Sequence, residues 1–265
     1  MNPDPPSPPY TAPARRDRLV LALGLVLVSA LAWLATVEQA RRMTNMDAAG
    51  VATAGQAWTP LEIGLIFAMW TIMMAAMMLP ASFPMVAAFA NINHRRRQRD
   101  APYVATAVFV CGYLVAWTGY CALATSVQWG LQSRGLLSPM MEATSPALTA
   151  ALFLLAGLYQ LSPLKDACLA RCRSPAGFIL AYWRDGVPGA VLMGLRHGAY
   201  CIGCCAGLML LLFAVAVMDL RWVVALAVLV TAEKLLPRPE LWRRAIAVVL
   251  VLIGLALGAS LVLQG

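Results

Sequence analysis

The sequence predicts an all-α, polytopic transmembrane helical bundle, and three observations carry that prediction. Of the 265 residues, 61% are hydrophobic and only 12% are charged, a composition far from that of soluble globular domains. Apolar runs long enough to cross a hydrocarbon core of about 30 Å recur along the chain. Basic residues gather in alternate connecting segments, as they do on the cytoplasmic side of membrane proteins.

About seven spans are expected, with the N-terminus inside and the C-terminus outside. The expected spans are 19–37, 62–89, 103–130, 146–161, 200–218, 222–236 and 245–263. Residues 1–18 are Pro-rich and predict a disordered cytoplasmic tail, which leaves 19–265 as a single transmembrane domain. Six spans remain the alternative if the fourth or the sixth segment does not cross. The pattern indicates a multi-pass protein of the plasma membrane, the inner membrane of a bacterium.

The second span has a clear start and a methionine-rich centre. Thr59 at the cap and Pro60 in the first turn are typical of a helix N-terminus. Pro80 and Pro84 are expected to kink this helix or to open its backbone. Thioethers are soft ligands for copper(I), although a stripe of methionines also serves as ordinary packing. The candidate thioether ligands are Met73, Met74, Met77 and Met78.

The apolar stretch 187–218 is too long for one straight span. At 1.5 Å per residue it would extend roughly 48 Å, against a hydrocarbon core of about 30 Å. We therefore expect an interfacial or re-entrant helix over 188–197, before the fifth span. Gly198 and Gly203 would supply the flexible points between the two parts.

The same stretch carries the main candidate site. His197, Cys201, Cys204 and Cys205 stand at i, i+4, i+7 and i+8, so a helix places them within a stripe roughly 100° wide. One imidazole and three thiols form a soft donor set that suits copper(I), with zinc as the alternative. Cysteines that merely fill apolar space are the competing interpretation.

A second pair of thiols lies in the basic segment before this stretch. Cys168 and Cys172 are four residues apart, so a helix would place both sulfurs on one face. A cytosolic location argues against a structural disulfide there. If residues 187–198 lie along the membrane surface, the two groups of thiols are close together. If the helix instead runs straight in, Cys201 lies roughly 21 Å deeper and the groups are separate.

Three charged residues near the apolar segments are possible charge partners. Glu233 and Lys234 end the sixth span and are expected to be an interfacial pair whose charges reach the headgroups, because they lie close to Pro237. The alternative is that the carboxylate lies inside the bundle as a ligand or proton carrier. Arg196, beside the candidate imidazole, is expected to face headgroups or a carboxylate, and Glu233 is a candidate partner. Cys111 and Cys121 have no soft neighbours in sequence and are interpreted as filler.

Several functional classes have no support in the sequence. No phosphate-binding Gly-rich loop with Lys-Ser/Thr and no soluble ATPase domain are present. The two histidines fit no Ser/His/Asp arrangement. The net charge of +8 is a topology signal rather than a sign of nucleic-acid binding. An enzymatic role is therefore not favoured.

Three motifs stand out over about residues 60–240, together with Leu208-Met209 and the Glu233-Lys234 pair. The motifs are Trp70-x-x-Met73-x-x-Ala76-Met77-Met78-Leu79-Pro80-x-x-x-Pro84, Pro163-x-Lys165-x-x-Cys168-x-x-x-Cys172-x-x-Pro175 and Gly194-x-x-His197-Gly198-x-x-Cys201-x-Gly203-Cys204-Cys205. In these motifs the chain resembles a bacterial family of predicted metal-binding integral membrane proteins of uncharacterised function. The family commonly has Trp after the cysteine pair, where this chain has Ala206. The resemblance implies neither a substrate nor a reaction.

The leading hypothesis is a membrane protein that handles a soft cation, copper(I) before zinc, for transport, delivery or homeostasis. Its partners would be the lipid bilayer, the metal ion and a protein that delivers metal or belongs to a membrane complex. A membrane thiol oxidoreductase or redox sensor is a second hypothesis, with Cys201 paired to Cys205 or Cys168. A structural or assembly subunit of a membrane complex is a third.

Overall fold

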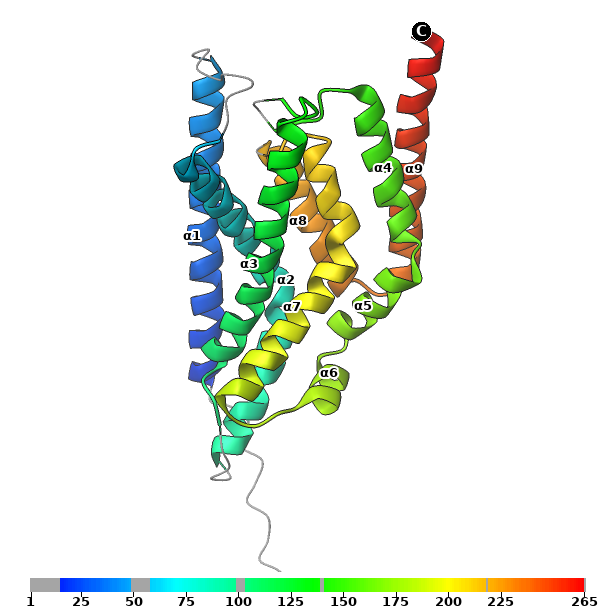
Figure 1. The fold of residues 1–265 in the computed structure, drawn as a ribbon. Coiled ribbons are helices and arrows are strands. Elements are labelled where there is room, and N and C mark those ends of the chain that lie inside the picture. Colours follow the sequence, from blue (N-terminus) through cyan, green and yellow to red (C-terminus); the bar gives the residue numbers. More distant parts are fainter. Residues whose placement is uncertain (1–14, 49–57, 99–102, 139–140, 218, 265) are drawn as a thin grey trace, which may run out of the picture.

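The described part of the protein is a bundle of helices. The computed structural model describes residues 15–48, 58–98, 103–138, 141–217 and 219–264 (Figure 1). Within these ranges the chain forms nine α-helices, one short 3₁₀ helix and no strand. The elements are α1 (Arg15–Ala48), α2 (Pro60–Gln98), α3 (Thr106–Gln132), α4 (Pro146–Gln160), α5 (Pro163–Arg173), α6 (Pro175–Tyr182), α7 (Gly186–Leu210), η1 (Leu211–Phe213), α8 (Leu220–Leu235) and α9 (Pro239–Gln264). The expectation of an all-helical bundle is confirmed.

Several of these helices have the length and composition of membrane spans. Five segments are long and apolar enough by themselves to cross a membrane. Helices α4 and α5 are so only as a pair, which is bent by 62° at its break. The five single segments are Ala22–Arg42, Pro60–Arg97, Thr106–Gln132, Gly186–Phe213 and Pro239–Leu263. Helix α8, with 16 residues, is shorter than these segments, so the seven-span count stays a prediction.

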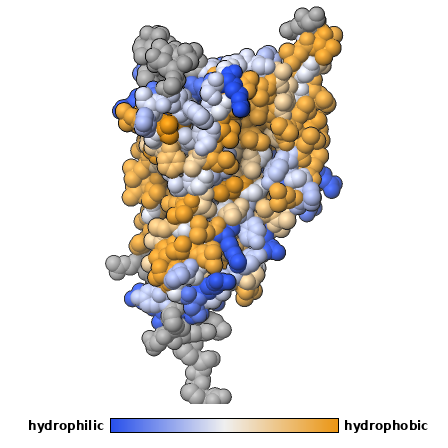
Figure 2. All heavy atoms as spheres, viewed as in Figure 1, coloured by the Kyte–Doolittle hydropathy of each residue, from blue (hydrophilic) through white to orange (hydrophobic). Residues whose placement is uncertain are grey.

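The outer surface of the bundle is apolar where a membrane would contact it. Exposed leucines and valines cover α1 and α9, among them Leu23, Leu34, Val248 and Leu255. In Figure 2 hydrophobic residues predominate over the middle of the face shown, and strongly hydrophilic residues gather toward its lower end. An apolar surface of this extent is typical of a protein that packs against lipid or other proteins.

Serine followed by proline starts three of the helices. Ser145, Ser162 and Ser174 cap α4, α5 and α6, and in each case the serine side chain accepts a backbone N–H from the first turn. Proline in the first turn loses no hydrogen bond there and has a φ that suits the helix. Thr59 and Glu62 form the equivalent reciprocal cap of α2, as the sequence predicted.

The N-terminal boundary differs from the expectation. Residues 15–18 belong to α1 rather than to a disordered tail, and residues 1–14 lie outside the described residues. The same helix continues to Ala48, past the expected end of the first span at residue 37. Helix α2 is also continuous, with Pro80 and Pro84 inside it.

The prediction of a separate interfacial or re-entrant helix over 188–197 is wrong, because α7 is one continuous helix from Gly186 to Leu210. Its 25 residues correspond to roughly 37 Å, a length that a tilted helix can accommodate in a bilayer. The apolar stretch is instead broken after the helix, at η1 and at Ala216, whose φ is 69°. The short helices that precede this span are α5 and α6.

Gly198 and Gly203 are contact points rather than flexible points. A side chain at Gly198 would collide with Ala116 on α3, and one at Gly203 would collide with the sulfur of Cys168 on α5. Gly112 and Gly194 likewise bring the backbones of α3 and α7 together. Small residues allow this close approach between membrane helices. The glycines of α7 therefore fix its distance from both neighbours.

Candidate metal centre

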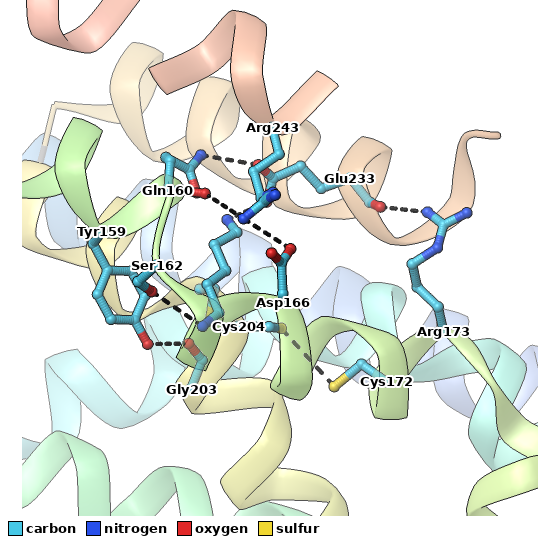
Figure 3. Close-up of polar contacts among 12 residues, drawn as sticks. Tyr159, Gln160, Ser162, Asp166, Cys172, Arg173, Gly203, Cys204, Glu233 and Arg243 are labelled. Atoms are coloured by element: carbon cyan, nitrogen blue, oxygen red, sulfur yellow. Dashed lines mark hydrogen bonds and ion pairs between the residues drawn. The ribbon is translucent and has the colours of Figure 1, made fainter. Parts of the chain in front are cut away.

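A buried ion pair fixes α5 against α8. Lys165 Nζ lies 2.7 Å from Glu233 Oε2, and the two side chains are 1% and 3% exposed. The other carboxylate oxygen accepts a hydrogen bond of 2.9 Å from Gln160 Nε2, at the end of α4 (Figure 3). Charges at this depth are costly unless they are paired and hydrogen-bonded, as they are here. The pair therefore holds the bend between α4 and α5 against the end of α8.

Two arginines complete this network at helix ends. Arg173 donates to the carbonyl oxygen of Glu233, in the last turn of α8 (Figure 3), and to that of Leu236, the residue that follows this helix. Arg243, at the start of α9, donates to the carbonyl of Gln160 and pairs with Asp166 at 2.8 Å. Helix C-termini leave carbonyl groups without partners inside the helix, and a guanidinium satisfies them.

This arrangement brings the two groups of thiols together. Cys172 on α5 faces Cys204 on α7, with their sulfurs 3.9 Å apart (Figure 3). Cys168, one turn earlier on α5, packs against the backbone of Gly203. The sequence left open whether Cys168 and Cys172 lie near the α7 cysteines. They do, because the bend after α4 lays α5 across the middle of α7.

Cys201 lies at the centre of the polar contacts. Its sulfur is fully buried and accepts a hydrogen bond of 2.9 Å from Lys234 Nζ on α8. The hydroxyl of Tyr113 on α3 lies 3.2 Å from the same sulfur. An ammonium at this distance stabilises negative charge on sulfur. Two other helices, α3 and α8, thus contribute to the surroundings of this one thiol on α7.

The thiols of Cys204 and Cys205 form hydrogen bonds within α7 itself. Cys204 and Cys205 both donate to the carbonyl of Cys201, at 3.1 Å and 2.9 Å. Such local bonds are weak and can be exchanged for a better ligand. The stripe predicted for α7 is therefore present, with Cys204 as the member that reaches across to α5.

His197 is buried among aromatic rings. It is 3% exposed and its ring centroid lies 5.4 Å from that of Tyr113, 5.7 Å from Phe178 and 6.0 Å from Phe109. Neither ring nitrogen has a hydrogen-bond partner among the described residues. A buried polar group without a partner is unusual and indicates a ligand or an ordered water.

The methionine stripe of α2 lies in the same core as the thiols. Met73, Met74, Met77 and Met78 are at most 1% exposed and belong to one packed cluster with Cys201, Cys204 and Cys205. Tyr113 links the two groups, because its hydroxyl donates to the carbonyl of Met78 and contacts Cys201. The soft donors of α2 therefore lie inside the bundle and not on its outer surface.

Two expectations about charge partners are wrong. Glu233 and Lys234 are 2% and 8% exposed and do not reach an interface; they turn inward to Lys165 and Cys201. Arg196 does not pair with Glu233, because its guanidinium lies 4.8 Å above the ring of Tyr182. The sequence pattern could not reveal that Lys165, from a separate helix, provides the counter-charge.

The side chains do not form a closed metal cage. Within the described ranges, no three or more His, Cys, Asp or Glu side chains are arranged to hold one metal ion. The seven cysteines are all free. The fold provides a close pair of thiols, Cys172 and Cys204, beside Cys201. On the same helix, about two turns before Cys204, lies the imidazole of His197, whose nitrogens have no partner among the described residues.

Tyr113 and Lys165 are the contributors that sequence reasoning missed. One tyrosine in an apolar span gave no signal, and Lys165 looked like an ordinary basic loop residue. The motif Pro163-x-Lys165-x-x-Cys168 could have suggested that the lysine and the cysteines share a helix, which α5 confirms.

Comparison with known proteins adds one finding. A family model described as PpoB2, copper chaperone, matches residues 67–257. This range contains every candidate ligand named above. No curated protein and no solved structure matches the chain.

Proposed function

Because the chain belongs to the copper-related PpoB2 family, described as copper chaperones, we propose that it binds copper(I) within the membrane and hands it on. Capture takes place at Cys172 and Cys204, with Cys201 and His197 as further donors. The methionines of α2 then receive the ion by exchange of ligands. The protein is a multi-pass protein of the inner membrane in this proposal, in keeping with its long apolar helices.

The observation that carries the proposal is the pair of sulfurs from different helices. Two bonds of about 2.3 Å, the usual length between zinc and thiolate sulfur, span at most about 4.6 Å. The separation of 3.9 Å between Cys172 and Cys204 therefore allows both sulfurs to bind one ion. Neither α5 nor α7 would need to move for both sulfurs to reach the same ion.

The chemistry of the donors favours copper(I) over zinc. Structural zinc sites are closed tetrahedra of four protein ligands, and no group of even three such ligands is preformed in the described residues. Copper(I) is soft, prefers thiolate and thioether sulfur, and is stable with two or three ligands. Donors of graded strength, thiols on α5 and α7 and thioethers on α2, suit an ion that must be released again.

The positive charge of Lys234 has a defined part in this proposal. Its ammonium group lies against Cys201 and balances negative charge on the sulfur while no metal is bound. An incoming copper(I) ion replaces the ammonium as the positive partner of this thiolate. The core stays neutral only if a second thiol loses its proton and binds the ion, so that its negative charge balances the ammonium of Lys234.

The test is copper stoichiometry and affinity of the purified protein in detergent. Under anaerobic conditions the protein should retain copper(I) in a fixed ratio against a competing chelator. Cys172→Ser/Cys204→Ser should weaken binding by more than about 100-fold, the upper range for loss of a group that merely supports a ligand. Cys111→Ser, at an exposed cysteine, is the matched control and should bind like the wild type.

An unchanged ratio and affinity in Cys172→Ser/Cys204→Ser would refute this site. Loading with zinc in parallel decides the metal, because a protein that retains zinc more firmly than copper(I) contradicts the preference argued here.

A thiol redox function is the second candidate, and one observation favours it. Whereas the sequence suggested the pairs of Cys201 with Cys205 or Cys168, the sulfurs of Cys172 and Cys204 lie 3.9 Å apart. Oxidation would remove two protons and two electrons from this pair and join the sulfurs, with diamide as the electron acceptor in vitro. Thiol trapping before and after diamide tests it, and unchanged trapping of both cysteines would exclude it.

A further inference from the structure

Helix α3 carries a stripe of polar side chains that faces the inside of the bundle. Its members recur every three or four residues and are all buried. They are Tyr113, Trp117, Cys121, Thr125 and Gln128. At 100° per residue they occupy a sector roughly 120° wide, which we call the polar face of α3. The glycine contact with α7, through Gly112, lies beside it on the same helix.

The polar face has more hydrogen-bonding groups than the protein satisfies. Buried atoms without a partner among the described residues are Trp117 Nε1, Thr125 Oγ1 and Gln128 Nε2, and one turn further Gln132 Oε1. Trp117, Thr125 and Gln128 are each at most 5% exposed. Such groups are rare in native cores unless water or a ligand completes them, and here they are aligned on one helix.

The two ends of the polar face lie at functionally different places. At one end, the hydroxyl of Tyr113 contacts Cys201. At the other, Gln128 Oε1 accepts a hydrogen bond of 2.7 Å from Trp70 Nε1, near the segment that follows α3. Tyr113 and Gln128 are fifteen residues apart, roughly 22 Å along the helix. The polar face therefore covers most of a hydrocarbon core of about 30 Å.

Soft donors stand along the same route. Cys121, midway along the polar face, is fully buried and belongs to the cluster that contains Met73, Met74 and Met77 of α2. Helices α2 and α3 pack side by side (Figure 1). Interpreting Cys121 as filler therefore neglects its position. It lies between Trp117 Nε1 and Thr125 Oγ1, which have no hydrogen-bond partner among the described residues, and in the same packed cluster as the methionines.

We propose that the polar face of α3 and the methionines of α2 line a water-accessible path from Cys201 to the end of the bundle where α3 meets the segment 133–145. The path conducts a soft monovalent cation, with Cys121 as a sulfur ligand midway. The identity of that cation as copper(I) rests on the proposed function. The hydration of the path does not, because it follows from the unpartnered polar atoms.

Accessibility of cysteines to a charged thiol reagent tests the path. The protein is reconstituted in nanodiscs and treated with a trimethylammonium methanethiosulfonate, and the labelled residues are identified by peptide mass. The probes are native Cys121 and Thr125→Cys. Val127→Cys is the matched control on α3, since Val127 is 41% exposed on the outer surface. Thr125→Cys changes little in volume, and Cys121 reports even if that variant fails to fold.

We expect Cys121 and Thr125→Cys to react at least about tenfold faster than Val127→Cys, because a thiol must ionise in water to react. Prior addition of Ag(I), a soft monovalent ion, should slow labelling of Cys121. Absence of labelling at both probes, or equal labelling of the control, would overturn the path.

The outcome is independent of the copper site. Absence of labelling with normal copper retention overturns the path and leaves the proposed function standing. Labelling that Ag(I) slows, in a protein without copper retention, supports the path and removes copper as its cargo.

Discussion

The buried pair of Lys165 and Glu233 is the residue-level feature on which the site most depends. It holds α5, and therefore Cys172, against α8. Removing one member of a buried pair leaves an uncompensated charge and costs about 3–5 kcal/mol, whereas neutralising both is often tolerated. The same reasoning explains why an acidic residue persists at this depth.

Glu233→Gln should therefore lower the thermal unfolding midpoint in detergent by roughly 10 °C. The double change Lys165→Met/Glu233→Gln should recover most of that loss, since no unpaired charge remains and the glutamine oxygen still accepts from Gln160. Glu38→Gln is the exposed comparison, because the pair of Glu38 and Arg42 is 53% and 74% exposed and is worth about 1 kcal/mol or less. Equal midpoints for the single and the double variant would contradict the interpretation.

At the level of elements, the contact between α3 and α7 sets the position of Cys201. Gly194 and Gly198 allow α7 to approach α3 backbone to backbone. This contact determines how far the sulfur of Cys201 lies from Tyr113. A larger residue at the contact would move the thiol as well as destabilise the bundle.

Gly198→Ala places a Cβ 2.5 Å from the Cβ of Ala116, and overpacking of this kind costs about 1–3 kcal/mol. We expect a lower unfolding midpoint and weaker copper(I) retention. The exchange Gly198→Ala/Ala116→Gly restores the space and should recover most of both. Gly119→Ala on α3 meets nothing within 4 Å and should behave as the wild type; a similar loss there would show that the effect is not packing.

On the scale of the whole molecule, the charge pattern predicts the orientation of the bundle in the membrane, which the arrangement of helices alone does not test. Basic residues are concentrated at the end of the bundle where α2 ends and α7 begins, as at Arg95 and Arg184. The positive-inside rule predicts that this end is cytoplasmic. The C-terminus lies at the opposite end in Figure 1.

Topology reporters check this orientation in cells. Alkaline phosphatase fused after residue 265 should be active, and green fluorescent protein fused there should be dark. Fusions after residue 184 should give the reverse and serve as the internal control. Fluorescence from the C-terminal fusion would mean an even number of spans and would favour the six-span alternative.

The sequence by itself determined that the chain is helical, where most of the long apolar helices lie and which residues share a stripe. These properties depend on residues within a few positions of one another. Thr59 caps the first turn of α2, and Cys201 and Cys205 share a face of α7 because they are four residues apart. The tertiary structure alone decided which helices meet. Glu233 was expected at an interface because it lies close to Pro237, while its partner Lys165 is 68 residues away. The stretch 187–218 was divided because it is too long for one straight span, with its glycines as the flexible points. Their packing against α3 and α5, and the pairing of Cys172 with Cys204, depend on contacts between distant segments, which local periodicity does not encode.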